Sequence, residues 1–121
     1  MKVLADSSIW IEHLRHRIRE FEILLENDDI GVHPFVIGEL ACGTLPKRTA
    51  FLREIEYLPK AGTVTQGEAL AFLGIHNLSG SGLGWVDIHL LASAFIAGAK
   101  VWTRDKALHK AAEKLRIAFY S

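Results

Sequence analysis

Hydrophobic and polar positions follow one another in blocks that predict short strands separated by amphipathic helices. Four short apolar runs, rich in residues that favour strands, are Met1–Ala5, Ile30–Val32, Lys100–Thr103 and Ile117–Tyr120. Between these runs, apolar residues recur at the spacing of a helix face. The helices predicted from that spacing cover residues 9–18, 18–25, 34–41, 46–58, 65–75, 85–97 and 105–115.

Strands that alternate with helices through short connections are typical of an α/β fold with a mainly parallel sheet. The chain has 121 residues, which suits one domain with a single apolar core. We therefore predict one domain over residues 1–121, with four to five short strands flanked by helices. The helix over residues 85–97 is apolar almost all round, so we expect it to be buried.

Composition limits the classes of protein to which the chain can belong. Half of the residues are hydrophobic and 23% are charged, which indicates a globular domain and not a disordered chain. The longest apolar stretch, Gly84–Lys100, is too short and too polar to span a membrane, and no signal peptide is predicted. The single cysteine, Cys42, excludes an internal disulfide, and we expect a buried, reduced thiol. A cytoplasmic location follows as the expectation.

The formal net charge is zero, which argues against a broadly basic nucleic-acid binder. The basic residues are nevertheless concentrated in two places. They are Arg15, His16, Arg17 and Arg19 in the first, and Arg104, Lys106, Lys110, Lys114 and Arg116 in the second. Each group is either a solvated helix face or a rim that contacts phosphates.

Four of the fourteen acidic residues lie at or within apolar segments. These are Asp6 after the first predicted strand, Glu39 in the helix over residues 34–41, Asp87 in the apolar helix, and Asp105 after the strand at 100–103. Burying a lone carboxylate costs several kcal/mol, so the cluster requires a compensating charge. Mg²⁺, or Mn²⁺ in its place, prefers carboxylate oxygens and satisfies all four residues together.

Each of these acids also has a structural interpretation. Asp6 and Asp105 have positions typical of helix N-caps, and Glu39 can reach solvent at a helix edge. Asp87 is the hardest to explain in this way, because its helix offers no polar face. An N-cap oxygen can also bind a metal, so the interpretations do not exclude one another.

Four carboxylates with a divalent cation, and no nucleophilic triad, suit hydrolysis of a phosphodiester. We assign metal binding, directly or through water, to Asp6, Asp87 and Asp105, and activation of the attacking water to Glu39. Three further residues are candidates for substrate contacts, although capping is an equal alternative for the hydroxyls: Ser7, Thr103 and Arg104. Repulsion among the acids predicts that some of them take up protons when no metal is bound.

The motifs that carry these acids resemble those of the PIN-domain family, and in particular its VapC-type toxins. The matching segments are Leu4-Ala5-Asp6-Ser7-Ser8-Ile9-Trp10-Ile11, His33-Pro34-Phe35-Val36-Ile37-Gly38-Glu39-Leu40, Gly84-Trp85-Val86-Asp87-Ile88-His89-Leu90-Leu91-Ala92-Ser93-Ala94 and Trp102-Thr103-Arg104-Asp105. Each segment alone is a weak signal, but the four in this order extend over nearly the whole chain.

The resemblance implies a PIN-like three-layer fold and a Mg²⁺- or Mn²⁺-dependent endoribonuclease, the toxin of a type II toxin–antitoxin pair. The family's four acidic positions fall on Asp6, Glu39, Asp87 and Asp105. It also implies a homodimer, a structured RNA substrate such as transfer RNA, and a VapB-type antitoxin whose C-terminal segment blocks the site. Apolar residues that are candidates for antitoxin contact, if they are not simply core, are Trp10, Leu14, Phe51 and Leu52.

Two other classes remain as alternatives. A phosphotransfer protein also places an aspartate after its first strand, but the phosphatase pattern needs a second aspartate where Ser8 stands. A receiver domain needs an acid pair at that strand end and a phosphoacceptor on a central strand, and neither is found. A non-catalytic interaction module would keep the acids as structural cation ligands, and an RNA cleavage assay separates it from an enzyme.

Overall fold

The computed structural model describes residues 1–121 and contains a three-stranded parallel sheet in the order β2-β1-β3. The strands are β1 (Val3–Ala5), β2 (Ile30–Gly31) and β3 (Lys100–Trp102). In the register, Val3 lies beside Ile30 on one side and beside Lys100 on the other. Because the strands are parallel, their carboxyl ends meet at one edge of the sheet.

The sheet has fewer strands than the four to five that the sequence predicts. The segment at 117–120 contributes one bridge, between Val101 and Ala118, and a second bridge joins Val32 to Lys60. Each of these segments runs beside the sheet for a single residue pair, too short to form a strand. The predicted α/β class with a parallel sheet is confirmed. The two bridges show where these segments would extend the sheet if they paired over more residues.

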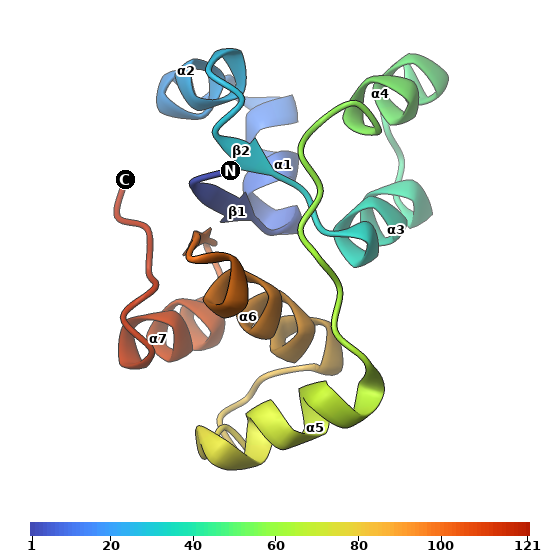
Figure 1. Ribbon diagram of the computed structural model, residues 1–121. Coiled ribbons are helices and arrows are strands. Elements are labelled where there is room, and N and C mark those ends of the chain that lie inside the picture. Colours follow the sequence, from blue (N-terminus) through green and yellow to red (C-terminus); the bar gives the residue numbers. More distant parts are fainter.

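Seven helices surround the sheet (Figure 1). Their bounds are α1 (Ser7–Arg15), α2 (Arg19–Glu26), α3 (Pro34–Cys42), α4 (Arg48–Ile55), α5 (Gln66–Ile75), α6 (Trp85–Ala97) and α7 (Lys106–Lys114). Helix α6 packs against β1 and β3, α7 packs against β3, and α5 covers the outer side of α6. Helices α1 and α2 pack against β1 and β2, while α3 and α4 extend to the side of α1.

The core joins residues that are distant in sequence. Leu4, Ile30 and Val101 are fully buried at the centre of the sheet. Trp10 packs edge-on against Phe21, with 4.8 Å between ring centroids. Trp10 is only 3% exposed, so this candidate for antitoxin contact is a core residue, whereas Leu14, Phe51 and Leu52 are half-buried.

Several local predictions differ from the structure. Helix α4 begins at Arg48 and not at Pro46, because Lys47 takes a left-handed conformation with φ of 48° and separates the proline from the helix. Cys42 is exposed and not buried, since it ends α3 on the solvent side. Helix α6 is buried from Ile88 to Ala94, but its last turn is exposed. None of the helices has the length and the hydropathy needed to traverse a bilayer.

Candidate active site

Two of the four predicted acids begin helices at the carboxyl edge of the sheet. Asp6 follows β1 and caps the N-terminus of α1, while Asp105 follows β3 and caps the N-terminus of α7. Strands β1 and β3 are neighbours, and the backbone N–H of Asp6 donates to the carbonyl of Trp102 at 3.0 Å. Sheet pairing therefore brings together two acids that are 99 residues apart in sequence.

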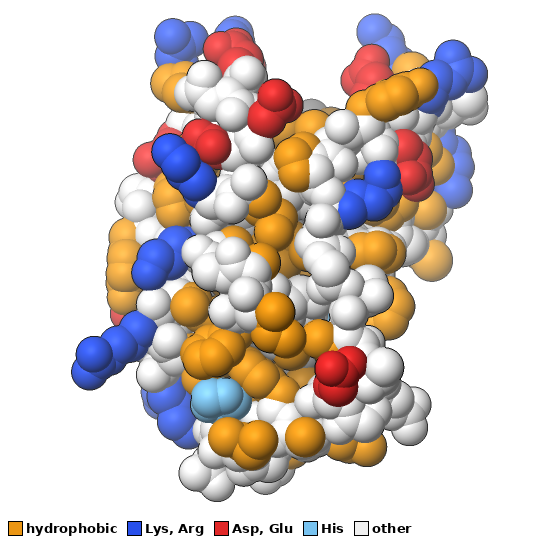
Figure 2. Space-filling model, in the orientation of Figure 1, with side chains coloured by type: hydrophobic (Ala, Val, Ile, Leu, Met, Phe, Trp, Pro, Cys, Tyr) orange, Lys and Arg blue, Asp and Glu red, His pale blue; other side chains and the backbone are white.

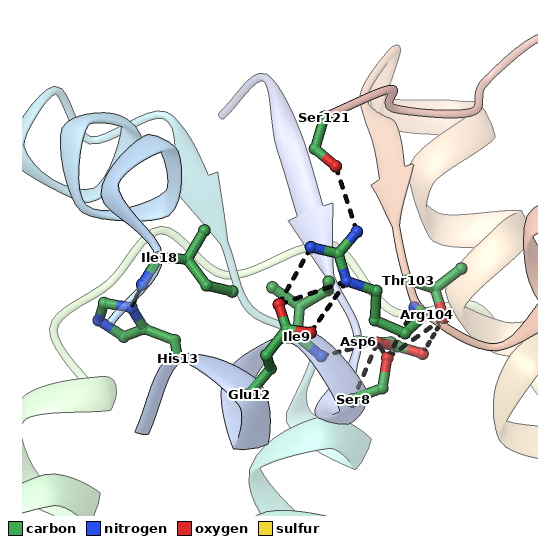
Figure 3. A network of polar contacts seen from close by, with 9 residues as sticks. All are labelled: Asp6, Ser8, Ile9, Glu12, His13, Ile18, Thr103, Arg104 and Ser121. Atoms are coloured by element: carbon green, nitrogen blue, oxygen red, sulfur yellow. Dashed lines mark hydrogen bonds and ion pairs between the residues drawn. The ribbon is translucent and has the colours of Figure 1, made fainter. Parts of the chain in front are cut away.

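Asp6 is buried and accepts hydrogen bonds on both carboxylate oxygens (Figure 3). Its Oδ1 accepts from the Ser8 N–H at 3.0 Å, from the Ser8 hydroxyl at 2.5 Å and from the Ile9 N–H at 3.3 Å. Its Oδ2 accepts from the Thr103 hydroxyl at 2.5 Å. Asp6 is thus both the cap of α1 and the centre of a network that ties β1 to β3, so the structural interpretation of Asp6 as an N-cap is confirmed.

The hydroxyls of Ser8 and Thr103 connect this network to the second acid. Thr103 Oγ1 accepts from the Asp105 N–H at 3.0 Å, and Ser8 Oγ accepts from the Arg104 N–H at 2.9 Å. Asp105 Oδ1 in turn accepts from the Leu108 N–H at 2.8 Å. Thr103, predicted as a substrate contact, is 5% exposed, and its bonds orient the carboxylates.

Glu39 and Asp87 enter the same region from α3 and α6. Asp87 lies in the first turn of α6, where its Oδ2 accepts from the Gly84 N–H at 2.9 Å. This bond explains how a carboxylate fits into an apolar helix, since it satisfies a backbone donor that the helix leaves free. Glu39 is exposed on α3, which packs against α1. The predicted Ser7 lies near Glu39, and its hydroxyl lowers the pKa of that carboxyl.

The pKa values of three of these acids are raised, by desolvation in all three and also by neighbouring carboxylates in two. Desolvation is the largest cause for Asp6, Glu39 and Asp87. The charges of Asp87 and Asp6 raise the pKa of Glu39 further, and the charge of Asp105 raises that of Asp87. Repulsion therefore links Glu39 to Asp6 and Asp87, and links Asp87 to Asp105. Desolvation contributes more to these raised pKa values than repulsion does, and proton uptake by the acids in the absence of metal stays a prediction.

The donor set fits a hard divalent cation. All four groups offer carboxylate oxygens, which Mg²⁺ and Mn²⁺ prefer. Asp87 Oδ1 and Asp105 Oδ2 accept no hydrogen bond from the protein. As the side chains stand, no three His, Cys, Asp or Glu residues lie close enough to hold one ion. A cation at this edge would therefore need changes in side-chain rotamer or bridging waters, which Mg²⁺ commonly retains.

Arg104, predicted as a substrate contact, is held by an acid on α1. Its Nη2 lies 3.0 Å from Glu12 Oε2, its Nε lies 3.2 Å from Glu12 Oε1, and its Nη1 donates to the Ser121 hydroxyl at 3.1 Å (Figure 3). Arg104 makes no ion pair with its sequence neighbour Asp105. Glu12 was not singled out from the sequence, because it lies 92 positions before Arg104 and the pairing leaves no local signal.

A mostly apolar cleft begins at the candidate site. It lies between α1 and the end of α3, and its volume is about 510 Å³. Glu39 and Arg15 are its charged lining residues, and Leu14 is one of its apolar ones. The remaining lining residues are Ile11, Leu40, Gly43, Thr44, Leu45 and Pro46. A segment bound in this cleft would contact Glu39.

Two buried histidines beside the site were also not assigned a role from sequence. His33 caps α3 through Nδ1, which accepts from the Phe35 N–H at 3.0 Å, and its Nε2 has no partner. His89 on α6 lies beside it, with 6.4 Å between the rings. Burial and the neighbouring His89 lower the pKa of His33 to about 4, so the ring is neutral near pH 7.

Comparison with known proteins agrees with this geometry. Residues 3–114 match the family described as PIN domain. The chain is 43% identical over 117 residues to Ribonuclease VapC32 of Mycobacterium tuberculosis, in the strains CDC 1551 / Oshkosh and ATCC 25618 / H37Rv. The aligned region covers 96% of this chain and 94% of that protein.

A solved structure supports the fold independently. The crystal structure of PAE2754 from Pyrobaculum aerophilum aligns with a TM-score of 0.69, covering 98% of this chain and 88% of that chain. Sequence identity in that alignment is 15%, so the likeness concerns the fold alone.

Proposed function

This chain belongs to the PIN-domain family, among its VapC-type ribonucleases, and on that premise we propose that it is a Mg²⁺-dependent endoribonuclease that acts through Asp6, Glu39, Asp87 and Asp105. Mn²⁺ is the alternative cation, and the proposed substrate is a structured RNA, such as transfer RNA, cut in a single-stranded loop. The observation that carries the proposal is that Asp6 and Asp105 cap helices at the carboxyl ends of neighbouring strands, while the charges of Asp6 and Asp87 raise the pKa of Glu39 and the charge of Asp105 raises that of Asp87.

Each of the four acids has a distinct role in the proposed reaction. Asp87 and Asp105 would hold the cation through the oxygens that the protein leaves free, and Asp6 would complete the site directly or through water. When bound, the cation supplies Lewis-acid stabilisation of the charge that develops on the scissile phosphate. Glu39 would accept a proton from the attacking water, whose oxygen joins phosphorus as a P–O bond of the RNA breaks and the leaving oxygen takes a proton. The raised pKa of Glu39 suits a general base.

The relatives named VapC imply a VapB-type antitoxin as partner, and we propose that part of it binds the cleft between α1 and α3. The apolar lining would bind hydrophobic side chains of such a segment, while Arg15 and Glu39 offer polar contacts at the rim. A segment lying there would cover Glu39 and so block the site. Among the apolar candidates from sequence, Leu14 lines this cleft.

A second copy of the chain is the other proposed partner. Exposed hydrophobic side chains gather over α5 and α6 (Figure 2). Ile75 and Ile96 are 73% and 71% exposed, and Leu70 and Phe95 are also exposed. Contiguous apolar surface of this kind marks an interface in soluble proteins. We propose that this α5–α6 patch packs against its equivalent in a homodimer.

The decisive experiment compares RNA cleavage by the wild type and an Asp87→Asn variant. Asparagine keeps an oxygen that can accept from the Gly84 N–H, so α6 should retain its cap while the charge is lost. Total RNA is incubated with each protein, free of antitoxin, in Mg²⁺ or in chelator. Discrete fragments from the wild type in Mg²⁺ alone support the proposal.

The control variant is Glu20→Gln, which removes one exposed carboxylate from α2, outside the site. It should cleave as the wild type does. Equal cleavage by Asp87→Asn and by the wild type would contradict the assigned site. Absence of cleavage despite measured Mg²⁺ binding would favour the non-catalytic module.

A further inference from the structure

We propose that one face of α7 binds the sugar–phosphate backbone of single-stranded RNA beside the candidate active site. This face, called here the α7 lysine face, consists of Lys106, Lys110 and Lys114. The inference rests on the proposed ribonuclease function and adds to it the surface along which the RNA lies. It concerns a docking surface, and none of its residues belongs to the acidic cluster.

The three lysines form one row because they are four residues apart on a helix. Successive members of such a row point to the same side and are separated by a rise of about 6 Å. Side chains of Lys and Arg gather along the edge of the molecule over α7 (Figure 2). Lys106 and Lys110 make no ion pair or side-chain hydrogen bond within the protein, and both are exposed.

Two hollows on either side of Lys110 give the row the form of a track. One is lined by Thr103, Arg104, Lys106, His109, Lys110 and Glu113, and contains no hydrophobic residue. The other is lined by Gly80, Ser81, Lys110 and Lys114 together with the apolar Leu78, Ala107 and Ala111. The first hollow, with its polar lining and the unpaired Lys106 and Lys110, complements the charge of a phosphate backbone.

The α7 lysine face adjoins the proposed reaction centre through Thr103. Thr103 lines the first hollow and also donates to Asp6 and accepts from the Asp105 N–H. The acid within that hollow, Glu113, is already engaged by the Tyr120 hydroxyl at 2.9 Å and by His109 at 3.7 Å. An RNA strand that runs from the acidic edge along α7 would therefore contact two unpaired lysines. The one acid beside it, Glu113, already has partners in the protein.

The other basic run, at residues 15–19, is less suited to this role. Arg17 is paired with Glu22 at 2.5 Å through two hydrogen bonds. Arg104, although next to the acids, is neutralised by Glu12. At the far end of the α7 lysine face, Lys114 is partly engaged, since it donates to the carbonyls of His76 and Asn77. Lys106 and Lys110 are therefore the free cations of the track.

The test measures binding of a fluorescent oligouridylate to the full chain in chelator, so that no cleavage occurs, over a series of salt concentrations. The Lys106→Gln/Lys110→Gln variant loses two phosphate contacts. For a single strand, each contact contributes about 0.7 to the slope of log affinity against log salt. The slope should therefore fall by about 1.4, and affinity at 0.1 M salt should fall about 20-fold.

The matched control is Arg19→Gln/Arg53→Gln, which removes the same formal charge from exposed positions on α2 and α4. Its slope should equal that of the wild type. An equal loss in both variants, an unchanged slope in the α7 variant, or no binding by the wild type at low salt would overturn the inference. Cleavage of total RNA in Mg²⁺ is measured in parallel. If the wild type cleaves RNA but the salt slope of the Lys106→Gln/Lys110→Gln variant is unchanged, only the role of the α7 lysine face is refuted. If the wild type binds RNA but never cleaves it, the proposed ribonuclease function is refuted.

Discussion

The Thr103 hydroxyl donates a hydrogen bond of 2.5 Å to Asp6 Oδ2, across 97 residues of sequence. The two residues follow neighbouring strands, β3 and β1, so the bond fastens the carboxyl edge of the sheet at the point where the acids meet. Asp6 is buried, and this bond lowers a pKa that burial raises. The contact thus links the stability of the sheet to the charge state of the candidate site.

Thr103→Val should destabilise the fold, because it leaves Asp6 Oδ2 without its partner in a buried setting. Removing one partner of a buried polar group costs about 1–3 kcal/mol of unfolding free energy. Urea titration monitored by tryptophan fluorescence measures the loss. Thr103→Ser keeps the hydroxyl and should recover most of the stability, while Thr63→Val at an exposed position should change little. A Thr103→Val protein as stable as the wild type would contradict this role of the bond.

Mg²⁺ should stabilise the folded chain if the four acids bind it. At ten times its Kd, a cation that binds only the folded state adds about 1.4 kcal/mol, which raises the Tm by a few degrees. Thermal scans with and without Mg²⁺ measure the shift. It should shrink in Asp87→Asn and Asp105→Asn, and remain in Glu20→Gln. Identical melting curves in Mg²⁺ and in chelator would count against a metal site.

Acid should destabilise the fold through His33. The pKa of this buried histidine falls from 6.5 to about 4, so between these values the unfolded chain binds a proton that the folded chain does not. Stability is therefore present above about pH 6.5 and is lost as the pH falls to about 4, by about 3 kcal/mol in total. The raised pKa values of Asp6, Glu39 and Asp87 act in the opposite sense, because protonation favours the folded state there.

A comparison with His33→Asn separates the two effects. Asparagine has a side-chain oxygen that can cap α3 in place of Nδ1, and it does not titrate. The difference in unfolding free energy between wild type and variant should narrow as the pH falls from 6.5 to 4, in urea titrations at several pH values. His16→Asn, at an exposed position, serves as the control. A difference that stays constant over this range would refute the assignment.

Ile96→Lys should weaken the proposed homodimer. Ile96 is 71% exposed in the single chain, and burying an isoleucine is worth about 1.5–3 kcal/mol. In a twofold dimer the change acts in both copies, so the Kd should rise on the order of 100-fold or more. Sedimentation equilibrium measures it, with Ile23→Lys on α2 as the control. A monomeric wild type would refute the homodimer, and a dimer equally weakened by Ile23→Lys would place the interface elsewhere.

Local sequence was sufficient for most of the elements and for the identity of the acids. All seven helices were predicted, because apolar spacing and capping residues such as Thr65 are local signals. The extent of the sheet at residue 60 and at residues 117–120 was harder to predict, because a segment becomes a strand only where a neighbouring segment pairs with it. The carboxylates were singled out from their apolar neighbours in sequence, and in the structure desolvation is the largest cause of the raised pKa values of three of them.

What the sequence by itself determined is the class of fold and which four acids lie at or within apolar segments, since periodicity and the cost of burying charge are properties of short segments. What only the tertiary structure decided is which groups meet. The pairing of β1 with β3, and the packing of helices beside it, produce the hydrogen bond from Thr103 to Asp6 and the ion pair between Arg104 and Glu12. The same packing leaves Lys106 and Lys110 without partners in the protein. Side-chain partners that are 90 or more residues apart leave no periodic trace, because only the folded chain brings them within hydrogen-bonding distance.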